Sequence, residues 1–90
     1  MDVIIKEHAR FEIQRRRIEE TDIITVINQP QQRTSSMKGR IVLQSKYFDK
    51  MEQKEMLLRV IGKESQEGFV VITAYKTSRI EKYWKKEVIG

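Results

Sequence analysis

The only histidine, His8, is the side chain best suited to proton transfer. Imidazole is the one side chain that titrates near neutral pH without help from its surroundings. His8 lies beside an apolar helical stripe, so it could equally be a histidine packed at a helix edge with one hydrogen bond. Because no second histidine or cysteine supplies a ligand spacing, a metal site is disfavoured. The sequence therefore offers His8 for acid–base chemistry and predicts no metal and no cofactor.

Arg59 is the one charge in an otherwise apolar run, residues 56–61. A buried charge is costly unless it is compensated. Either Arg59 meets a carboxylate, with Glu12 or Glu55 as candidates, or it points into a site built for an anion. Arg40 has the same two interpretations. Arginine binds phosphate oxygens with a two-pronged fork and does not lose its charge, so both arginines are candidates for phosphate binding.

A group of hydroxyls, phenols and cations follows the most strand-like stretch, residues 69–75. Its members are Tyr75, Thr77, Ser78, Arg79, Lys82 and Tyr83. In the simpler interpretation, Tyr83 and Trp84 pack in the core and the lysines are solvated. Alternatively, aromatics beside cations suit stacking on unpaired nucleic-acid bases. The chain contains no Walker loop, nucleophile elbow or dinucleotide fingerprint, and no pair of carboxylates stands out as acid and base.

Composition favours a polyanionic partner without requiring one. Charged residues make up 34% of the chain, and the net charge is +5. RNA, DNA, a membrane surface or an acidic protein would each suit that charge. The chain has no cysteine, which excludes a disulfide framework, a thiolate zinc site and a cysteine nucleophile. No apolar run approaches the roughly 20 residues of a membrane helix, so we expect a cytoplasmic protein without a membrane partner.

The elements that must position these side chains follow from hydrophobic periodicity. Ninety residues, 39% of them hydrophobic, predict a single domain over residues 1–90. Apolar positions at helical spacing predict one helix over residues 6–16 and a second from residue 20 or 21 to residue 28. A short linker joins them, which predicts a helical hairpin. Residues 3–5 are either a short strand or the lead into the first helix.

The second half of the chain reads as strands. Residues 40–48, 55–61 and 69–75 are predicted strands, with a hairpin loop over residues 62–68. Residues 29–38 are predicted as a polar loop, either throughout or with a brief edge strand inside it. We expect residues 69–75 at the centre of the sheet, with Ile72 in the middle. A short terminal helix within residues 80–86 should be capped by Thr77 or Ser78. The predicted class is α+β: an N-terminal helical hairpin packed on a three- to four-stranded antiparallel sheet, with a short C-terminal helix.

Several segments together resemble a small prokaryotic domain family of unassigned function. Members of that family open with a pattern like HAxxRMxxRGIxxxDIxxVLxxP. The matching residues in the first half are His8, Ala9, Arg10, Ile13, Arg16, Ile18, Asp22, Ile23, Val26, Ile27 and Pro30. Later matching pieces are Gly39–Arg40, residues 58–60, residues 71–75, residues 77–79 and residues 82–84. The resemblance runs from His8 to Trp84, nearly the whole chain.

That family is similar to the RelE-like toxins of bacterial toxin–antitoxin systems, which are metal-independent ribonucleases. The resemblance implies RNA as substrate, on the ribosome or free, and an acidic antitoxin as protein partner. His8 would be the acid or base, and Arg40 and Arg59 would hold the phosphate. Tyr75 would be a second proton donor or a stacking surface. The expected RNA contacts are Arg16, Thr77, Ser78, Arg79, Lys82 and Tyr83.

Arg17 departs from this pattern, because the family has glycine there. A helix often ends at that point in a left-handed residue, which costs a non-glycine about 1 kcal/mol. The turn, and with it the positions of His8 and Arg16, is therefore open. Two other functions also remain open: a basic surface that binds RNA or an acidic antitoxin without cutting, and a structural or regulatory partner protein. Convergence of His8, Arg59 and Tyr75 on one concave patch would favour catalysis.

Overall fold

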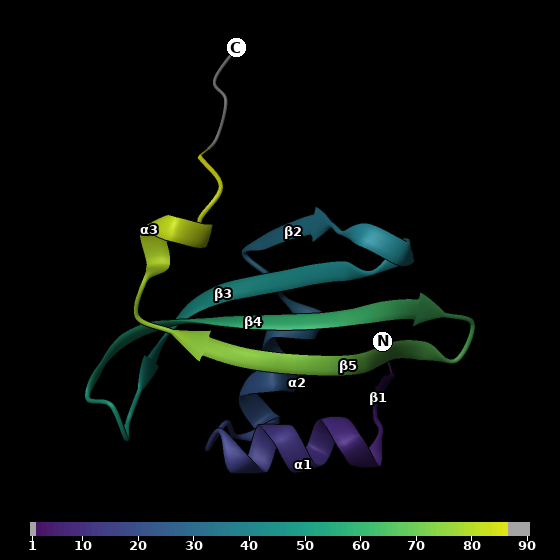
Figure 1. Cartoon of the computed structure of the whole chain (residues 1–90), viewed down its shortest axis with the longest axis horizontal. Coiled ribbons are helices and arrows are strands. Elements are labelled where there is room, and N and C mark those ends of the chain that lie inside the picture. The colour runs from purple at the N-terminus through teal and green to yellow at the C-terminus, as the bar shows by residue number, and fades with distance from the viewer. Residues whose placement is uncertain (1, 87–90) are drawn as a thin grey trace.

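The computed structural model describes residues 2–86 and shows a twisted sheet with helices beside and behind it (Figure 1). The strands are β1 (Val3–Ile5), β2 (Gln32–Ser35), β3 (Ile41–Asp49), β4 (Lys54–Ser65) and β5 (Gly68–Thr77). The helices are α1 (Glu7–Arg15), α2 (Glu20–Asn28) and α3 (Ile80–Tyr83), with a short 3₁₀ turn, η1 (Met37–Gly39). The predicted α+β class is confirmed.

The sheet differs from the prediction in size, order and direction. It has five strands in the order β1-β5-β4-β3-β2, and β1 runs parallel to β5 while the other neighbours are antiparallel. The predicted three- to four-stranded antiparallel sheet therefore has too few strands, and it lacks the parallel pair of β1 and β5. The central strand is β4, and β5 lies between it and the three-residue β1. The expectation that residues 69–75 form the centre was wrong, because β4 is the middle strand of the β3–β4–β5 meander, and β1 and β2 extend the sheet by one strand on each side.

The two N-terminal helices bury their apolar stripes against different strands. α1 contacts β5, whereas α2 contacts β3 and β4. Ile13 of α1 and Ile23 of α2 are fully buried, as are Val60 and Phe69 of the sheet. The helical hairpin is thus matched only in part: the helices follow each other closely, but each is held by its own strands. The hydrophobic core lies between this helical layer and one face of the sheet.

Arg17 adopts the left-handed conformation that the family glycine would favour, with φ 57°. The amide of Ile18 donates to the Ile13 carbonyl at 3.0 Å, and the amide of Arg17 donates to the Gln14 carbonyl at 3.0 Å. These two bonds are the Schellman pattern that ends many helices. Ile18 and Ile13 are both buried in the core, which supplies the hydrophobic contact of that motif. The turn geometry is therefore kept, with the strain carried by an arginine.

An irregularity in the β4–β5 ladder explains why Ile72 is not central and why no loop begins at Gly62. Ile61 pairs with Thr73 and Gly62 with Val71, so Ile72 has no partner and forms a bulge. Phe69, Val71 and Ala74 are therefore the buried residues of β5, and Ile72 is only half-buried. A Cβ at Gly62 would lie 2.3 Å from the Val70 carbonyl oxygen. The glycine thus permits a close approach inside a long strand, at the position where the sequence predicts the start of a loop.

Two smaller boundaries were also misplaced. β4 continues to Ser65 and β5 begins at Gly68, so the predicted loop over residues 62–68 shrinks to a tight turn. The cap position of α3 is Arg79, without a side-chain cap, while the Thr77 hydroxyl accepts the Arg79 amide hydrogen at 3.1 Å. In the described part of the chain, no helix is long and apolar enough to cross a membrane.

Candidate functional site

The face of the sheet opposite α1 and α2 has a cation near its centre, Arg59. Arg59 pairs with Gln44 of β3 on one side and with Tyr75 of β5 on the other. Its Nε donates to the Gln44 side-chain oxygen at 2.9 Å, and its Nη1 donates to the Tyr75 hydroxyl at 2.5 Å. Among the described residues Arg59 forms no ion pair, so neither Glu12 nor Glu55 compensates its charge. Neutral groups hold this half-buried cation.

Aromatic rings complete the surroundings of Arg59. The guanidinium carbon lies 4.3 Å from the centre of the Tyr83 ring and 5.6 Å from that of Tyr75. The two rings meet edge to face, with centroids 6.1 Å apart. Such contacts stabilise a cation without neutralising it. Within residues 2–86, Nη2 has no hydrogen-bond acceptor, so one edge of the guanidinium fork is free to bind an oxyanion such as phosphate.

The C-terminal segment, residues 80–86, is fastened across this face by two glutamine side chains. Gln44 donates to the Tyr83 carbonyl at 3.1 Å and to the Gln32 side-chain oxygen at 2.7 Å. Gln32 in turn accepts from the Lys85 amide at 2.9 Å and donates to the Lys85 carbonyl at 2.6 Å. Gln44 is only 1% exposed. These bonds place Tyr83 over Arg59 although the two residues are far apart along the chain.

A second polar cluster lies at the free edge of β5, where β1 ends. His8 Nε2 lies 3.6 Å from Glu12 Oε1, and the His8 side chain is 82% exposed. The Thr73 hydroxyl donates to Glu12 at 3.0 Å, and this bond is the main reason that the pKa of Glu12 is lowered. Arg16 adds to that lowering at 3.3 Å. An ionised carboxylate facing an exposed imidazole can orient its ring.

Arg16, predicted to contact RNA, is used inside the fold. Its Nη1 donates to the Ala74 carbonyl at 2.7 Å and to the Thr73 hydroxyl at 3.1 Å, and its Nη2 donates to Glu12. β1 pairs only with residues 69–71, so the Ala74 carbonyl would otherwise face outward without a strand partner. Arg16 therefore closes a sheet edge instead of presenting its fork to a ligand.

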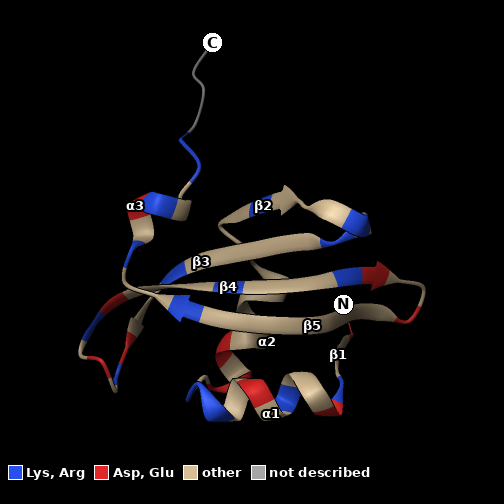
Figure 2. Cartoon of the chain, viewed as in Figure 1, with Lys and Arg blue, Asp and Glu red and all other residues tan. Residues whose placement is uncertain are grey.

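The remaining predicted residues are spread along the same side of the sheet. Arg40 is exposed at the start of β3, four residues before Gln44, which is about 13 Å along a strand. Thr77 ends β5, and Ser78, Arg79 and Lys82 line a shallow pocket at α3. Figure 2 shows a basic position in the middle of β4 and further ones on α3. The structure thus joins Arg59, Tyr75 and Tyr83 in one cluster and leaves Arg40 outside it.

His8 of α1 is linked to the strand that carries Tyr75 only through Glu12, which binds Thr73 of β5. Thr73, which binds the partner of His8, is two positions from Tyr75 on the same side of the strand. No hydrogen bond joins His8 to Arg59 or Tyr75 among the described residues. The convergence of all three on one patch is therefore only partial.

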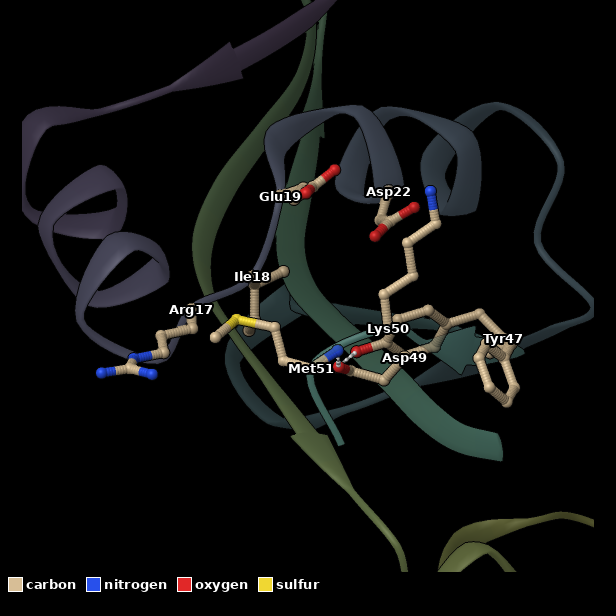
Figure 3. A pocket seen from close by; sticks show the side chains of 9 residues that line it. Arg17, Ile18, Glu19, Asp22, Tyr47, Asp49, Lys50 and Met51 are labelled. Atoms are coloured by element: carbon tan, nitrogen blue, oxygen red, sulfur yellow. Dashed lines mark hydrogen bonds between the residues drawn. The ribbon is translucent and has the colours of Figure 1, made fainter. Parts of the chain in front are cut away.

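The helical side of the sheet contains a pocket of about 320 Å³ (Figure 3). One of the residues that line it, Asp49, belongs to a buried ion pair. Lys76 Nζ lies 2.8 Å from Asp49 Oδ2, with side chains 11% and 6% exposed. Tyr47 donates to the same oxygen at 2.7 Å, and the amides of Met51 and Glu52 donate to Oδ1. The hydrogen bond from Lys76 is the main cause that lowers the pKa of Asp49, although burial opposes it. None of the predicted site residues lines this pocket.

Sequence reasoning missed Gln44 and Gln32, and it named Glu12 only as a carboxylate for Arg59, whereas Glu12 faces His8 and Thr73. One signal for Gln44 was present. The turn after Asp49 pairs Asp49 with Lys54. Counting five residues away from the turn along each strand pairs Gln44 with Arg59. Gln32 has no comparable local signal, because the Lys85 backbone that it binds lies 53 residues away. Glu12 lies four residues from both His8 and Arg16, a helical spacing that the sequence contains, whereas its bond to Thr73 spans 61 residues.

Comparison with known proteins gives one match. A family model described as a domain of unknown function, DUF4258, matches residues 5–76. No curated protein and no solved structure matches the chain. Nowhere in residues 2–86 do three or more histidine, aspartate or glutamate side chains gather in a way that could hold a metal ion.

Proposed function

This chain belongs to the DUF4258 family, a domain of unknown function, and we propose that it is a metal-independent endoribonuclease of the toxin type. It would act in the cytoplasm on RNA, free or on the ribosome, and an acidic antitoxin would restrain it. The proposed fold relation is to RelE-like toxins, with β3–β5 as the antiparallel part that the two fold types would share. The resemblance of residues 8–84 to relatives of those toxins supports this assignment.

The observation that carries the proposal is the cation at Arg59. A half-buried guanidinium normally pairs with a carboxylate, since uncompensated charge is costly away from water. Here two neutral oxygens and two aromatic rings hold it, and Nη2 is left over. A phosphate diester would supply the missing negative charge, and the rings of Tyr75 and Tyr83 offer stacking surfaces for unpaired bases.

The proposed chemistry needs a base, an acid and charge stabilisation. A base takes the proton of the 2′-hydroxyl, whose oxygen attacks the phosphorus, and an acid protonates the leaving 5′-oxygen. His8, backed by Glu12, is the proposed acid or base, and the Tyr75 hydroxyl is the second candidate for proton transfer. General acid–base catalysis contributes roughly 10²–10⁴-fold. Arg59 would stabilise the charge that develops on the phosphate oxygens, a term of similar size or larger.

A second function is favoured by the position of His8. Because no contact ties His8 to Arg59 or Tyr75, the same surface could bind RNA or an acidic antitoxin segment without cleaving it. Binding would then depend on Arg59 and the basic residues of α3. The bound RNA would stay intact, and replacing His8 would have no effect on it.

One experiment separates these functions. A labelled single-stranded RNA is incubated with the protein in the presence of a metal chelator, and cleavage and binding are measured together. Variant Arg59→Leu should reduce cleavage about 10²–10³-fold, the usual loss for one preorganised donor. Lys63→Leu is the matched control, because it removes the same charge from an exposed position on β4. His8→Ala should abolish cleavage and preserve binding.

Three outcomes decide the matter. Cleavage that resists the chelator and falls with Arg59→Leu, but not with Lys63→Leu, supports the ribonuclease. Binding without cleavage, weakened by Arg59→Leu, supports the binding module, and removal of one phosphate-binding cation should make the log–log salt dependence shallower by about 0.7. Equal behaviour of the two leucine variants rules out a phosphate role for Arg59 in either function.

A further inference from the structure

Gln44 is a buried amide whose orientation is fixed at both ends. Its oxygen accepts from Arg59 Nε, which can only donate. Its nitrogen donates to the Gln32 side-chain oxygen and to the Tyr83 carbonyl. Turning the amide over would set donor against donor at Arg59 and oxygen against oxygen at the other two partners. The network therefore has one direction: Arg59 donates to the Gln44 oxygen, and the Gln44 nitrogen donates to Gln32 and Tyr83.

The neutrality of this side chain matters for the charge of Arg59. A glutamate has the same length and would place a carboxylate against Nε, in a bond that is stronger than the one with an amide. On the other face of the sheet a carboxylate does meet a cation, because Asp49 pairs with Lys76. Glutamine keeps the geometry of the contact but adds no negative charge. The positive charge of Arg59 is thus left uncompensated from within the fold.

The contacts also fix the plane of the guanidinium. Gln44 and Tyr75 hold two of its nitrogens, and the Tyr83 ring lies against its face. A free arginine side chain loses rotational entropy when it binds a ligand, and prior immobilisation removes that cost. Because Gln44 also binds the Tyr83 carbonyl, one residue controls both the plane and the ring that covers it.

We propose that Gln44 is the positioning residue of the Arg59 anion site: it orients the guanidinium and, being neutral, keeps its charge available for a phosphate. The inference rests on the proposed function, in which Arg59 binds a phosphate of RNA. It adds a residue that acts through Arg59 and that the family resemblance does not include.

The first test measures Arg59 directly and needs no RNA. In nitrogen-15 NMR spectra, the Nε–H signal of Arg59 should exchange with water at least tenfold more slowly than those of exposed arginines. Gln44→Met, which keeps the length and removes both hydrogen-bonding groups, should abolish that protection. An Arg59 Nε–H that exchanges as fast in the wild type as in Gln44→Met overturns the proposal.

The second test uses charge, with Gln44→Glu against Gln66→Glu. Both variants change net charge equally, and Gln66 is exposed in the turn between β4 and β5. Inorganic phosphate and a single-stranded oligoribonucleotide serve as probes, and phosphate binding is followed by the shift of the Arg59 signal. Gln44→Glu should bind both probes at least tenfold more weakly than Gln66→Glu does. Equal affinities of the two variants overturn the proposal.

Failure of the proposed function gives a different pattern. If the wild type neither binds nor cleaves RNA, but phosphate still shifts the Arg59 signal in Gln66→Glu and not in Gln44→Glu, the role of Gln44 stands and the RNA function falls. If RNA binds and Gln44→Glu changes nothing, the function stands and the role of Gln44 falls. A wild type that binds neither probe contradicts both.

Discussion

Two cations on neighbouring strands, Arg59 and Lys76, are handled in opposite ways. Tyr75, the partner of Arg59, is the residue next to Lys76 on β5, so the two cations point to opposite faces of the sheet. On the helical face, Lys76 meets the buried carboxylate of Asp49 at 2.8 Å. On the other face, Arg59 meets a glutamine, a phenol and two rings, and no carboxylate in the described residues.

The difference separates structure from candidate function. Asp49 receives four hydrogen bonds, from Tyr47, Lys76 and two backbone amides, so this pair is complete without a ligand. Such a pair ties the β3–β4 turn to the end of β5. Arg59 has an unused nitrogen and an uncompensated charge, both of which an outside anion would satisfy. The pocket beside Asp49 is therefore a weaker candidate for ligand binding than the face around Arg59.

The largest expected effect is on stability, from Lys76→Met. Removing the ammonium leaves the Asp49 carboxylate buried and unpaired, which typically costs about 3–5 kcal/mol. Arg59→Leu strands no opposite charge and should cost at most about 1–3 kcal/mol, from the unpaired Gln44 oxygen. Denaturant unfolding of both variants measures the free energies. A larger loss for Arg59→Leu than for Lys76→Met would reverse the comparison.

The next effect is the acid dependence of stability. The pKa of Asp49 is lowered in the folded state, chiefly by its hydrogen bond from Lys76. The stability it contributes is thus fully present above the unfolded pKa of about 3.9, and it is lost as pH falls through the lower folded pKa. Asp49→Asn should be less stable at neutral pH and should show a flatter decline below about pH 5. The double variant with Lys76→Met isolates the pair.

Unfolding curves between neutral pH and strong acid provide the measurement. The pKa values of Glu12 and Glu64 are also lowered, so part of the acid dependence should persist in Asp49→Asn. The pKa of Asp22 is raised, mainly by burial, and its contribution has the opposite sign. If the stability of Asp49→Asn changed with pH in parallel with that of the wild type, the Lys76–Asp49 ion pair would contribute nothing to the acid dependence.

The smallest effect is expected from Arg17→Gly. Arg17 occupies the left-handed region, where glycine avoids a cost of about 1 kcal/mol. The Arg17 carbonyl accepts a hydrogen bond from Lys76 Nζ at 3.4 Å, so this turn lies beside the Lys76–Asp49 ion pair and not on the Arg59 face. The variant should gain up to about 1 kcal/mol in unfolding free energy, while the Arg59 NMR signal stays unchanged. A stability loss would mean that the Arg17 side chain contributes more than its backbone costs.

Local patterns in the sequence predicted most elements because each depends on near neighbours. The spacing of Ala9 and Ile13 indicated α1, and alternation indicated β3. The conflict between Arg59 and its apolar run showed that a compensating arrangement had to exist. Sequence could not show that this arrangement lacks a carboxylate, since Gln44 meets Arg59 only through the register of β3 and β4, and Tyr83 meets it only after the C-terminal segment folds back.

The side of the sheet on which Tyr75 lies could not be predicted from the sequence, because it depends on the strand register. Counting back from the tight turn between Ser65 and Gly68, a regular ladder would pair Arg59 with Ala74 and send Tyr75 to the helical face. The bulge at Ile72 shifts the register by one, so Tyr75 faces Arg59 and Ala74 enters the core. Sequence by itself determined the strands, the charge and the glycine at position 62 that tolerates the bulge. Only packing decided the register, because burying Phe69 and Val71 together with Ala74 on one face requires an extra residue between them.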